Sequence, residues 1–144
     1  ELGREGVKTV GMNIGGPARV LDLEIYMVPA LHSSSRGAPV GFIIRGPRTV
    51  YHAGDTGLFG DIKLYAELVP VDYALVPIGG HFTMDPAQAA LFVSLFRPRY
   101  AIPMHYNTFP LIRQDPKVFA EEVRRRSPGT EVLILKPGES VKLR

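Results

Sequence analysis

The side chains best suited to chemistry in this sequence are four histidines and one aspartate, each at or near the end of an apolar stretch: His32, His52, Asp55, His81 and His105. Neutral imidazole nitrogens and carboxylate oxygens together form a donor set that suits zinc, iron or manganese. The sequence contains no cysteine, which excludes disulfides, thiolate metal sites and cysteine nucleophiles. A metal bound by this chain must therefore be held by histidine and carboxylate.

The stretch around Asp55 carries the strongest local signal. An apolar run leads through His52 into a tight turn, with Gly54 and Gly57 on either side of the aspartate. Glycines suit backbone with positive φ or with a close approach to another group. The carboxylate could hold a cation or accept a proton, or it could only hydrogen-bond its own turn. The other histidine segments favour a chemical role.

The hydrophobic pattern predicts where the elements that position these residues lie. We expect strands over residues 8–14, 18–29, 40–44, 49–53, 73–77, 99–103, 131–135 and 140–143, and helices over 61–68, 85–96 and 115–126. Strands 40–44 and 49–53 should form a hairpin, and the continuous apolar strand 73–77 should be buried on both faces. Asp85 and Asp115 are the expected N-caps, each followed by a proline at the first helical turn. Strands followed by alternating strands and helices predict an α/β layered domain, in which strand-end loops host the site.

Three of the five residues are the expected metal ligands: His32, Asp55 and His105. His52 lies three positions before Asp55, so on a regular strand its side chain points to the opposite face. We therefore interpret His52 as structural, or as a residue that orients a ligand by hydrogen bonding.

His81 follows two glycines, which give its loop freedom to approach a site. This histidine could position substrate, transfer a proton or contact metal. Residues 33–35 are all serine, and they could orient the ligands together with Thr56, or they could only form turns.

Composition limits the class of protein. The chain has 144 residues, enough for one domain, with 45% hydrophobic and 22% charged residues and a net charge of +3. No apolar run approaches the roughly 18 residues that span a membrane, and without a secretory leader we expect a cytoplasmic protein. The basic residues near the C-terminus suit a solvated face rather than a nucleic-acid surface. Neither a serine nucleophile elbow nor a phosphate-cradling loop is present.

Four segments resemble the metallo-β-lactamase superfamily, and more narrowly its group of uncharacterised metal-dependent hydrolases of bacteria and archaea. They are Ala30-Leu31-His32-Ser33-Ser34-Ser35, Tyr51-His52-Ala53-Gly54-Asp55-Thr56-Gly57, Pro77-Ile78-Gly79-Gly80-His81-Phe82-Thr83-Met84 and Pro103-Met104-His105-Tyr106-Asn107-Thr108-Phe109-Pro110. The resemblance implies an αββα sandwich with a two-metal site at one edge of the sheets. It assigns His32 and His105 as ligands and Asp55 as the bridging ligand, with His81 in a loop characteristic of the narrower group.

The family's signature His-x-His-x-Asp-His is absent from this sequence. Residues 1–144 therefore resemble the C-terminal portion of a single domain. The resemblance implies that a second segment or chain carrying that motif completes both the fold and the site, so we expect an oligomer or a split domain.

The implied activity is metal-dependent hydrolysis of a small ester, lactone or phosphodiester. Two divalent ions, zinc before manganese or iron, would activate a water, with Asp55 and His81 as catalytic residues. The alternatives are a non-catalytic subunit and a nucleic-acid-processing subunit of the same fold.

Overall fold

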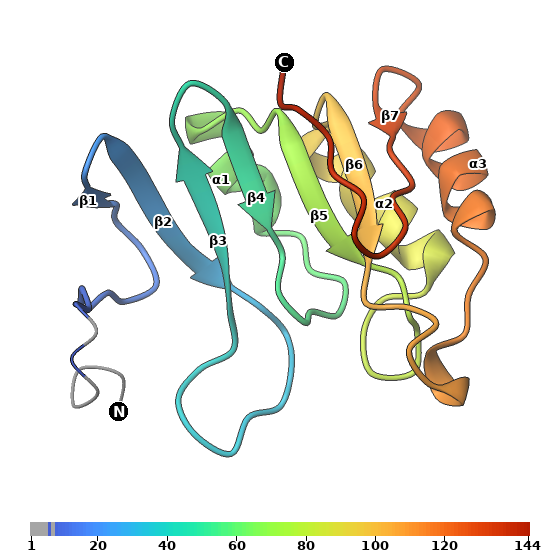
Figure 1. The fold of residues 1–144 in the computed structure, drawn as a ribbon, viewed down its shortest axis with the longest axis horizontal. Coiled ribbons are helices and arrows are strands. Elements are labelled where there is room, and N and C mark those ends of the chain that lie inside the picture. The colour runs from blue at the N-terminus through green and yellow to red at the C-terminus, as the bar shows by residue number, and fades with distance from the viewer. Residues whose placement is uncertain (1–5, 7) are drawn as a thin grey trace.

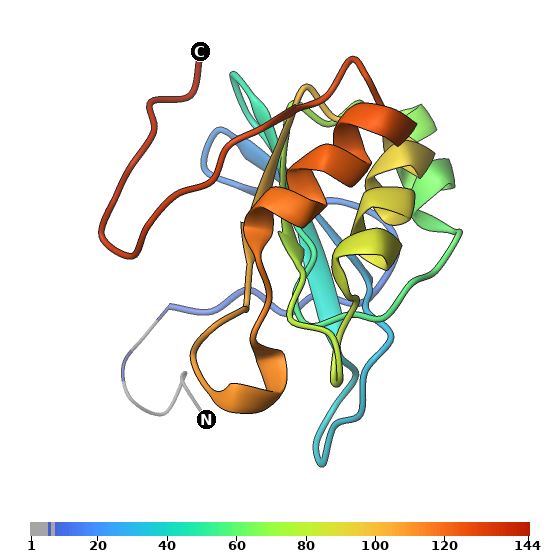
Figure 2. The same cartoon turned by 90° about the vertical axis from the view of Figure 1, so that its right-hand side faces the viewer.

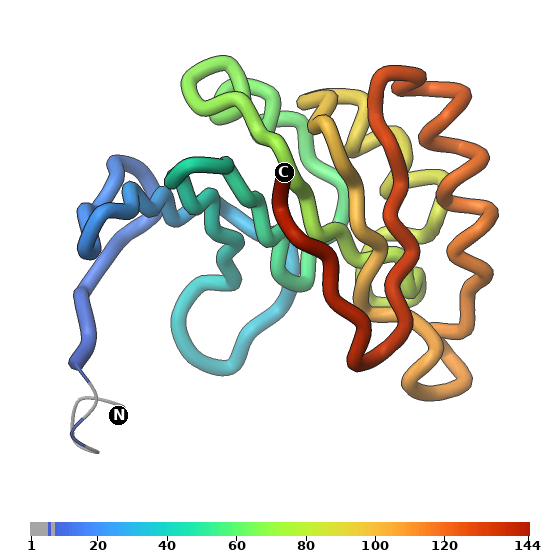
Figure 3. Tube along the Cα trace, turned by 45° about the horizontal axis from the view of Figure 1, so that its top comes forward, coloured from blue at the N-terminus to red at the C-terminus, as the bar shows by residue number. Residues whose placement is uncertain are grey.

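A computed structural model describes residue 6 and residues 8–144 as a mixed β-sheet with helices (Figure 1). Within this described part, the strands form a seven-stranded sheet whose spatial order is the chain order. The strands are β1 (Ala18–Val20), β2 (Leu23–Pro29), β3 (Val40–Arg45), β4 (Thr49–His52), β5 (Tyr73–Pro77), β6 (Tyr100–Met104) and β7 (Glu131–Val132). The chain therefore adds its strands one after another from β1 at one side of the molecule towards the C-terminal helix at the other (Figure 3).

The mode of strand pairing changes once across the sheet, at β4. Neighbours from β1 to β4 pair antiparallel, and neighbours from β4 to β7 pair parallel. A parallel pair needs a crossover connection, and a helix fills each one here. These helices are α1 (Ile62–Leu68), α2 (Pro86–Phe96) and α3 (Pro116–Arg126). All three lie on the same face of the sheet (Figure 2).

The hydrophobic core lies between that face and the helices. Tyr51 of β4 is fully buried, and its ring centroid lies 6.3 Å from that of Phe92 and 5.6 Å from that of Phe96, both on α2. Burial raises the pKa of the Tyr51 phenol well above its ordinary value, so this side chain stays neutral in the core. Successive strand residues point to opposite faces, and Ile43 of β3 therefore joins the same core.

The opposite face of the sheet carries apolar side chains without a helix above them. Phe42 and Ile44 flank Ile43 in β3, so they point away from the core. Together with neighbouring residues they line an open, largely apolar hollow formed by Lys8, Val10, Met12, Val20, Ile25, Phe42, Ile44 and His52. Farther along this face, the C-terminal segment lies over β5 and β6 (Figure 2), and the Arg144 amide donates to the Tyr73 hydroxyl at 2.9 Å.

Most of the predicted elements are confirmed, including the hairpin of β3 and β4, the buried strand β5 and all three helices. The predicted strand over residues 8–14 is wrong, since this segment pairs with no described strand. The stretch 18–29 is two strands, because Leu21 turns the chain with φ 55°. At the C-terminus, 131–135 shortens to Glu131–Val132. Residues 140–143 are not a strand, because this segment lies over the face of the sheet, where Arg144 contacts the Tyr73 side chain. Every helix of the described residues is too short or too polar to cross a bilayer.

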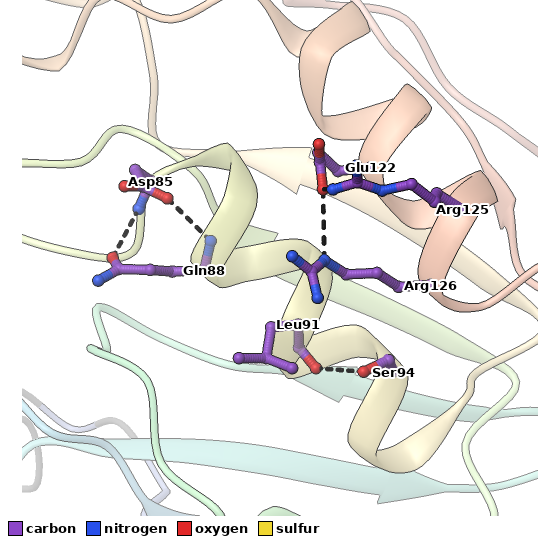
Figure 4. A network of polar contacts seen from close by, with 7 residues as sticks. All are labelled: Asp85, Gln88, Leu91, Ser94, Glu122, Arg125 and Arg126. Carbon is purple, nitrogen blue, oxygen red and sulfur yellow. Dashed lines mark hydrogen bonds and ion pairs between the residues drawn. The ribbon is translucent and has the colours of Figure 1, made fainter.

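The N-terminus of α2 provides a test of the local folding logic (Figure 4). The Asp85 carboxylate accepts a hydrogen bond from the Gln88 amide at 2.8 Å, and the Gln88 side chain accepts one from the Asp85 amide at 3.1 Å. We expect Asp85→Ala to lower the free energy of unfolding by about 1 kcal/mol, because a helix amide loses its acceptor. Asp85→Asn keeps an acceptor oxygen and should cost less. Equal losses for both variants in urea denaturation would contradict this assignment.

Candidate metal centre

Four loops meet at one edge of the sheet, the lower edge in Figure 1. They follow β2, β4, β5 and β6, and they carry His32, Asp55, His81 and His105 in that order. Strands β4, β5 and β6 end at this edge because they are parallel, and β2 ends there because two antiparallel steps separate it from β4. The topology therefore confirms the predicted gathering of strand-end loops.

The Asp55 turn packs tightly against the start of β3. Gly54 adopts φ +65°, and a Cβ at this position would lie 2.5 Å from the carbonyl oxygen of Val40. Only glycine fits such a turn without displacing the backbone. The residue that follows Asp55, Thr56, is completely buried, whereas the Asp55 side chain is 49% exposed. The turn therefore buries Thr56 and leaves the Asp55 carboxylate exposed at this edge of the sheet.

His105 faces this carboxylate from the end of β6. Its Nε2 atom lies 3.3 Å from Asp55 Oδ2, and the imidazole is 32% exposed. Its Nδ1 atom is buried and has no hydrogen-bond partner among the described residues. The structure therefore brings together two of the three predicted ligands, from segments far apart in the sequence.

The geometry of this pair fits two ligands of one metal ion. Two donors bound tetrahedrally at about 2.0–2.1 Å from zinc lie about 3.3–3.4 Å from each other. The observed separation of 3.3 Å matches that spacing and exceeds the usual hydrogen-bond length of about 2.9 Å. The carboxylate oxygen carries lone pairs, and Nε2 carries one in the neutral tautomer with the proton on Nδ1. The donor set present is therefore suited to a divalent ion.

His32 lies outside the pair of Asp55 and His105. Its side chain is exposed, and its Nδ1 atom lies 2.9 Å from the carbonyl oxygen of Ser33. Within the described residues, no group of three or more histidines and carboxylates is close enough to share an ion. The role of His32 as a ligand therefore stays a prediction, although its neighbour Leu31 is hydrogen-bonded to the Asp55 turn.

His81 lies on a turn with a left-handed backbone. Gly80 and His81 have φ 67° and 55°, and the His81 ring packs edge-on against Phe82 at 4.4 Å between centroids. The imidazole is exposed at the loop edge. No described contact joins it to Asp55, so its predicted role in proton transfer stays a prediction too.

His52 is on the other side of the sheet, as the alternation of strand residues predicts. It lines the apolar hollow of the open face, and its Nδ1 atom accepts a hydrogen bond from the Gly54 amide at 3.2 Å. This contact joins His52 to the Asp55 turn from the open face of the sheet, which agrees with a structural or orienting role.

Backbone contacts hold the loops after β5 and β6 against each other. A Cβ on Gly79 would lie 2.4 Å from the carbonyl oxygen of His105. The Gln114 side chain donates to the Gly79 carbonyl at 3.3 Å, and the Gln114 main-chain amide donates to the side-chain oxygen of Asn107 at 2.8 Å. Neither Gln114 nor Asn107 had an expected role. The available signal was Asn107 two positions after His105, since asparagine is enriched at left-handed positions such as its φ of 63°.

Comparison with known proteins assigns the chain to a family. A family described as beta-lactamase superfamily domain matches residues 1–106 of the chain, well over half of its length. The chain belongs to this family. Its curated relatives include metal-dependent hydrolases of Caldivirga maquilingensis and Thermofilum pendens, which are 55% and 58% identical over 143 and 142 residues. These matches cover 97% and 98% of this chain but 63% and 62% of the two relatives, so the chain spans less than two thirds of their length.

Solved structures confirm the fold of this beta-lactamase superfamily member. The metallo hydrolase Igni18 from the hyperthermophilic archaeon Ignicoccus hospitalis has a TM-score of 0.90 and 46% identity, over 97% of this chain and 63% of that protein. The metallo-beta-lactamase fold protein YhfI from Bacillus subtilis has a TM-score of 0.70 at 14% identity, over 90% of this chain and 53% of YhfI. The predicted α/β fold of metallo-β-lactamase type is confirmed. The described residues form one helix layer and one sheet layer of it.

We expect Gly79→Ala to displace the His105 loop, because the added methyl group would overlap the His105 carbonyl oxygen and approach the Ile112 side chain at 2.9 Å. Overpacking of this kind costs about 1–3 kcal/mol of stability. Metal affinity should fall in parallel, which titration with zinc would measure.

The matched control for this substitution is Gly60→Ala, since a Cβ there meets nothing within 4 Å. If both alanine variants keep the metal affinity and stability of the parent protein, Gly79 does not constrain the site.

Proposed function

We propose that this chain supplies part of the two-metal site of a hydrolase that cleaves a small ester, lactone or phosphodiester. The observation that carries the proposal is the approach of His105 Nε2 to within 3.3 Å of Asp55 Oδ2 at the loop edge of the sheet. The names of the curated relatives, which are metal-dependent hydrolases, support the same reaction class.

In this proposal, His32, Asp55 and His105 are the ligands that the chain contributes. When bound, two divalent ions lower the pKa of a water molecule and polarise the scissile bond. The Asp55 carboxylate has two oxygens, so it can bridge both ions. Each histidine gives one nitrogen. Imidazole and carboxylate donors favour zinc, with manganese or iron as alternatives.

His81 is the proposed proton-transfer residue. Its imidazole is exposed at the same edge, on a turn held to the Asp55 segment by a hydrogen bond from the Met84 amide to the Thr56 carbonyl at 3.3 Å. An imidazole can accept a proton from the attacking water and return it to the leaving group. His81 therefore acts at the substrate and not as a ligand.

The proposed site needs further donors. The described residues hold Asp55 and His105 together but contain no three-residue donor group. We propose that a segment with the motif His-x-His-x-Asp-His supplies the other ligands, on the same polypeptide or on a second one. Such a segment would also cover the open face of the sheet, where Phe42 and Ile44 line an apolar hollow. Burial of this apolar surface would stabilise the assembled protein.

Asp55→Asn should abolish metal-dependent hydrolysis by the assembled protein. The amide has the size of the carboxylate but lacks the charge that balances two cations. Because the side chain is 49% exposed, the free energy of unfolding should change by less than about 1 kcal/mol. Turnover of ester and phosphodiester substrates and bound metal should be measured together.

Asp61→Asn is the control, since Asp61 is an exposed carboxylate of the same connection and makes no side-chain capping bond to α1. It should leave turnover unchanged. Near-full activity of Asp55→Asn on any substrate would show that Asp55 is not the bridging ligand.

Residues 1–144 alone should bind fewer than two metal ions and should self-associate through the open sheet face. Addition of the motif-bearing segment should give a soluble complex with two ions and measurable turnover. The measurements are the mass in solution, the metal content and the rate of ester hydrolysis. An active two-metal monomer of residues 1–144 by itself would refute the need for a completing segment, and an assembled protein that binds no metal would favour the non-catalytic alternative.

A further inference from the structure

Thr56 is a polar side chain that is completely buried at the loop edge of the sheet. Its hydroxyl accepts a hydrogen bond from the Leu31 amide at 2.9 Å and donates one to the Gly57 carbonyl at 2.8 Å. A hydroxyl has a single proton to donate, so its donor capacity is fully used. The orientation of this side chain is therefore fixed by two backbone groups, and not by packing alone.

The bond to Leu31 joins two segments that are 25 positions apart. A second bond closes the contact, since the Gly57 amide donates to the Leu31 carbonyl at 2.8 Å. Leu31 directly precedes His32, and Thr56 directly follows Asp55. The hydroxyl thus joins the residue directly after Asp55 to the residue directly before His32.

Thr56 also contacts the third loop of the edge. Its carbonyl oxygen accepts a hydrogen bond from the Met84 amide at 3.3 Å, which anchors the turn that carries His81. Ser34 differs from Thr56, because its hydroxyl exchanges hydrogen bonds with Arg36 inside its own turn. Among the contacts of the described residues, Thr56 is the candidate orienting residue whose hydrogen bonds join different loops.

We propose that Thr56 is a positioning residue, whose hydroxyl holds the His32 loop against Asp55 and thereby raises the affinity of the site for a divalent ion. This inference rests on the proposed function, since it takes His32 and Asp55 as ligands. Residues that orient metal ligands by hydrogen bonding, without binding the metal, typically contribute about 10–100-fold to metal affinity. The effect on the fold is smaller, because the bond from the Gly57 amide to the Leu31 carbonyl remains when the hydroxyl is removed.

The test uses the full-length protein with three variants. Thr56→Val keeps the shape and removes the hydroxyl, whereas Thr56→Ser keeps the hydroxyl and removes one methyl group. Thr83→Val is the matched control, since Thr83 is a buried threonine of the same edge whose hydroxyl has no partner among the described residues. Zinc affinity is measured by chelator competition, thermal unfolding on metal-free protein, and hydrogen exchange at the Leu31 amide.

We expect Thr56→Val to weaken zinc binding about 10–100-fold and to accelerate exchange at the Leu31 amide. Thr56→Ser should restore most of the affinity, and Thr83→Val should leave it unchanged. Equal zinc affinities for the valine and serine variants at position 56 would overturn the proposal. So would a loss of metal-free stability in Thr56→Val large enough to account for the weaker binding.

Asp55→Asn, measured in the same assay, separates this inference from the proposed function. If Asp55→Asn loses zinc and Thr56→Val does not, only the role of Thr56 is refuted. If Asp55→Asn binds zinc as tightly as the parent protein, or the parent protein binds none, the proposed site itself is wrong and the role of Thr56 with it.

Discussion

The parallel pairing of β4, β5 and β6 is the constraint on which the rest of this structure depends. Each parallel step needs a crossover, and the crossover helices pack on one face, where they bury Tyr51, Phe92 and their neighbours. The same pairing brings three strand ends to one edge. The contact between Asp55 and His105 follows from this arrangement, because β5 is the one strand that separates β4 from β6 in the sheet.

The two faces of the sheet differ because the crossovers occupy only one of them. On the covered face, β5 and its neighbours contribute fully buried residues such as Ala74 and Val76. On the other face, Phe42 and Ile44 line a hollow that no described helix covers. A sheet with one solvated face normally alternates apolar and polar residues. The apolar residues at these outward positions suit the covering segment that we propose for this face.

Local signals were sufficient to predict most of the elements. Asp85 and Asp115, each followed by proline, marked the starts of α2 and α3. The apolar run at 73–77 predicted a strand buried on both faces. Residues 8–14 and 140–143 carry a strand-like pattern too, but a strand also needs a partner at the right distance. That partner depends on tertiary structure, which a local pattern does not contain.

The candidate site was predictable to a similar depth. Residue type and strand-end placement identified Asp55 and His105, because parallel strands fix where their ends lie. All four candidate side chains, His32 and His81 included, lie on loops that follow strands, and the conformation of a loop also depends on hydrogen bonds to distant residues. Gln114 is an example, since its bond to the Gly79 carbonyl joins two loops and leaves no periodic signal in the sequence.

His81 and His105 share a left-handed backbone, with φ values of 55° and 54°. This conformation costs an ordinary residue about 1–2 kcal/mol, and it persists only where the surrounding structure enforces it. At His105 the enforcement is visible, since Gly79 allows a close approach to its carbonyl oxygen. The direction of the Cα–Cβ bond of His105 is thus set by the main chain. An arriving ion would meet a preorganised donor, so little conformational entropy would be lost when it binds.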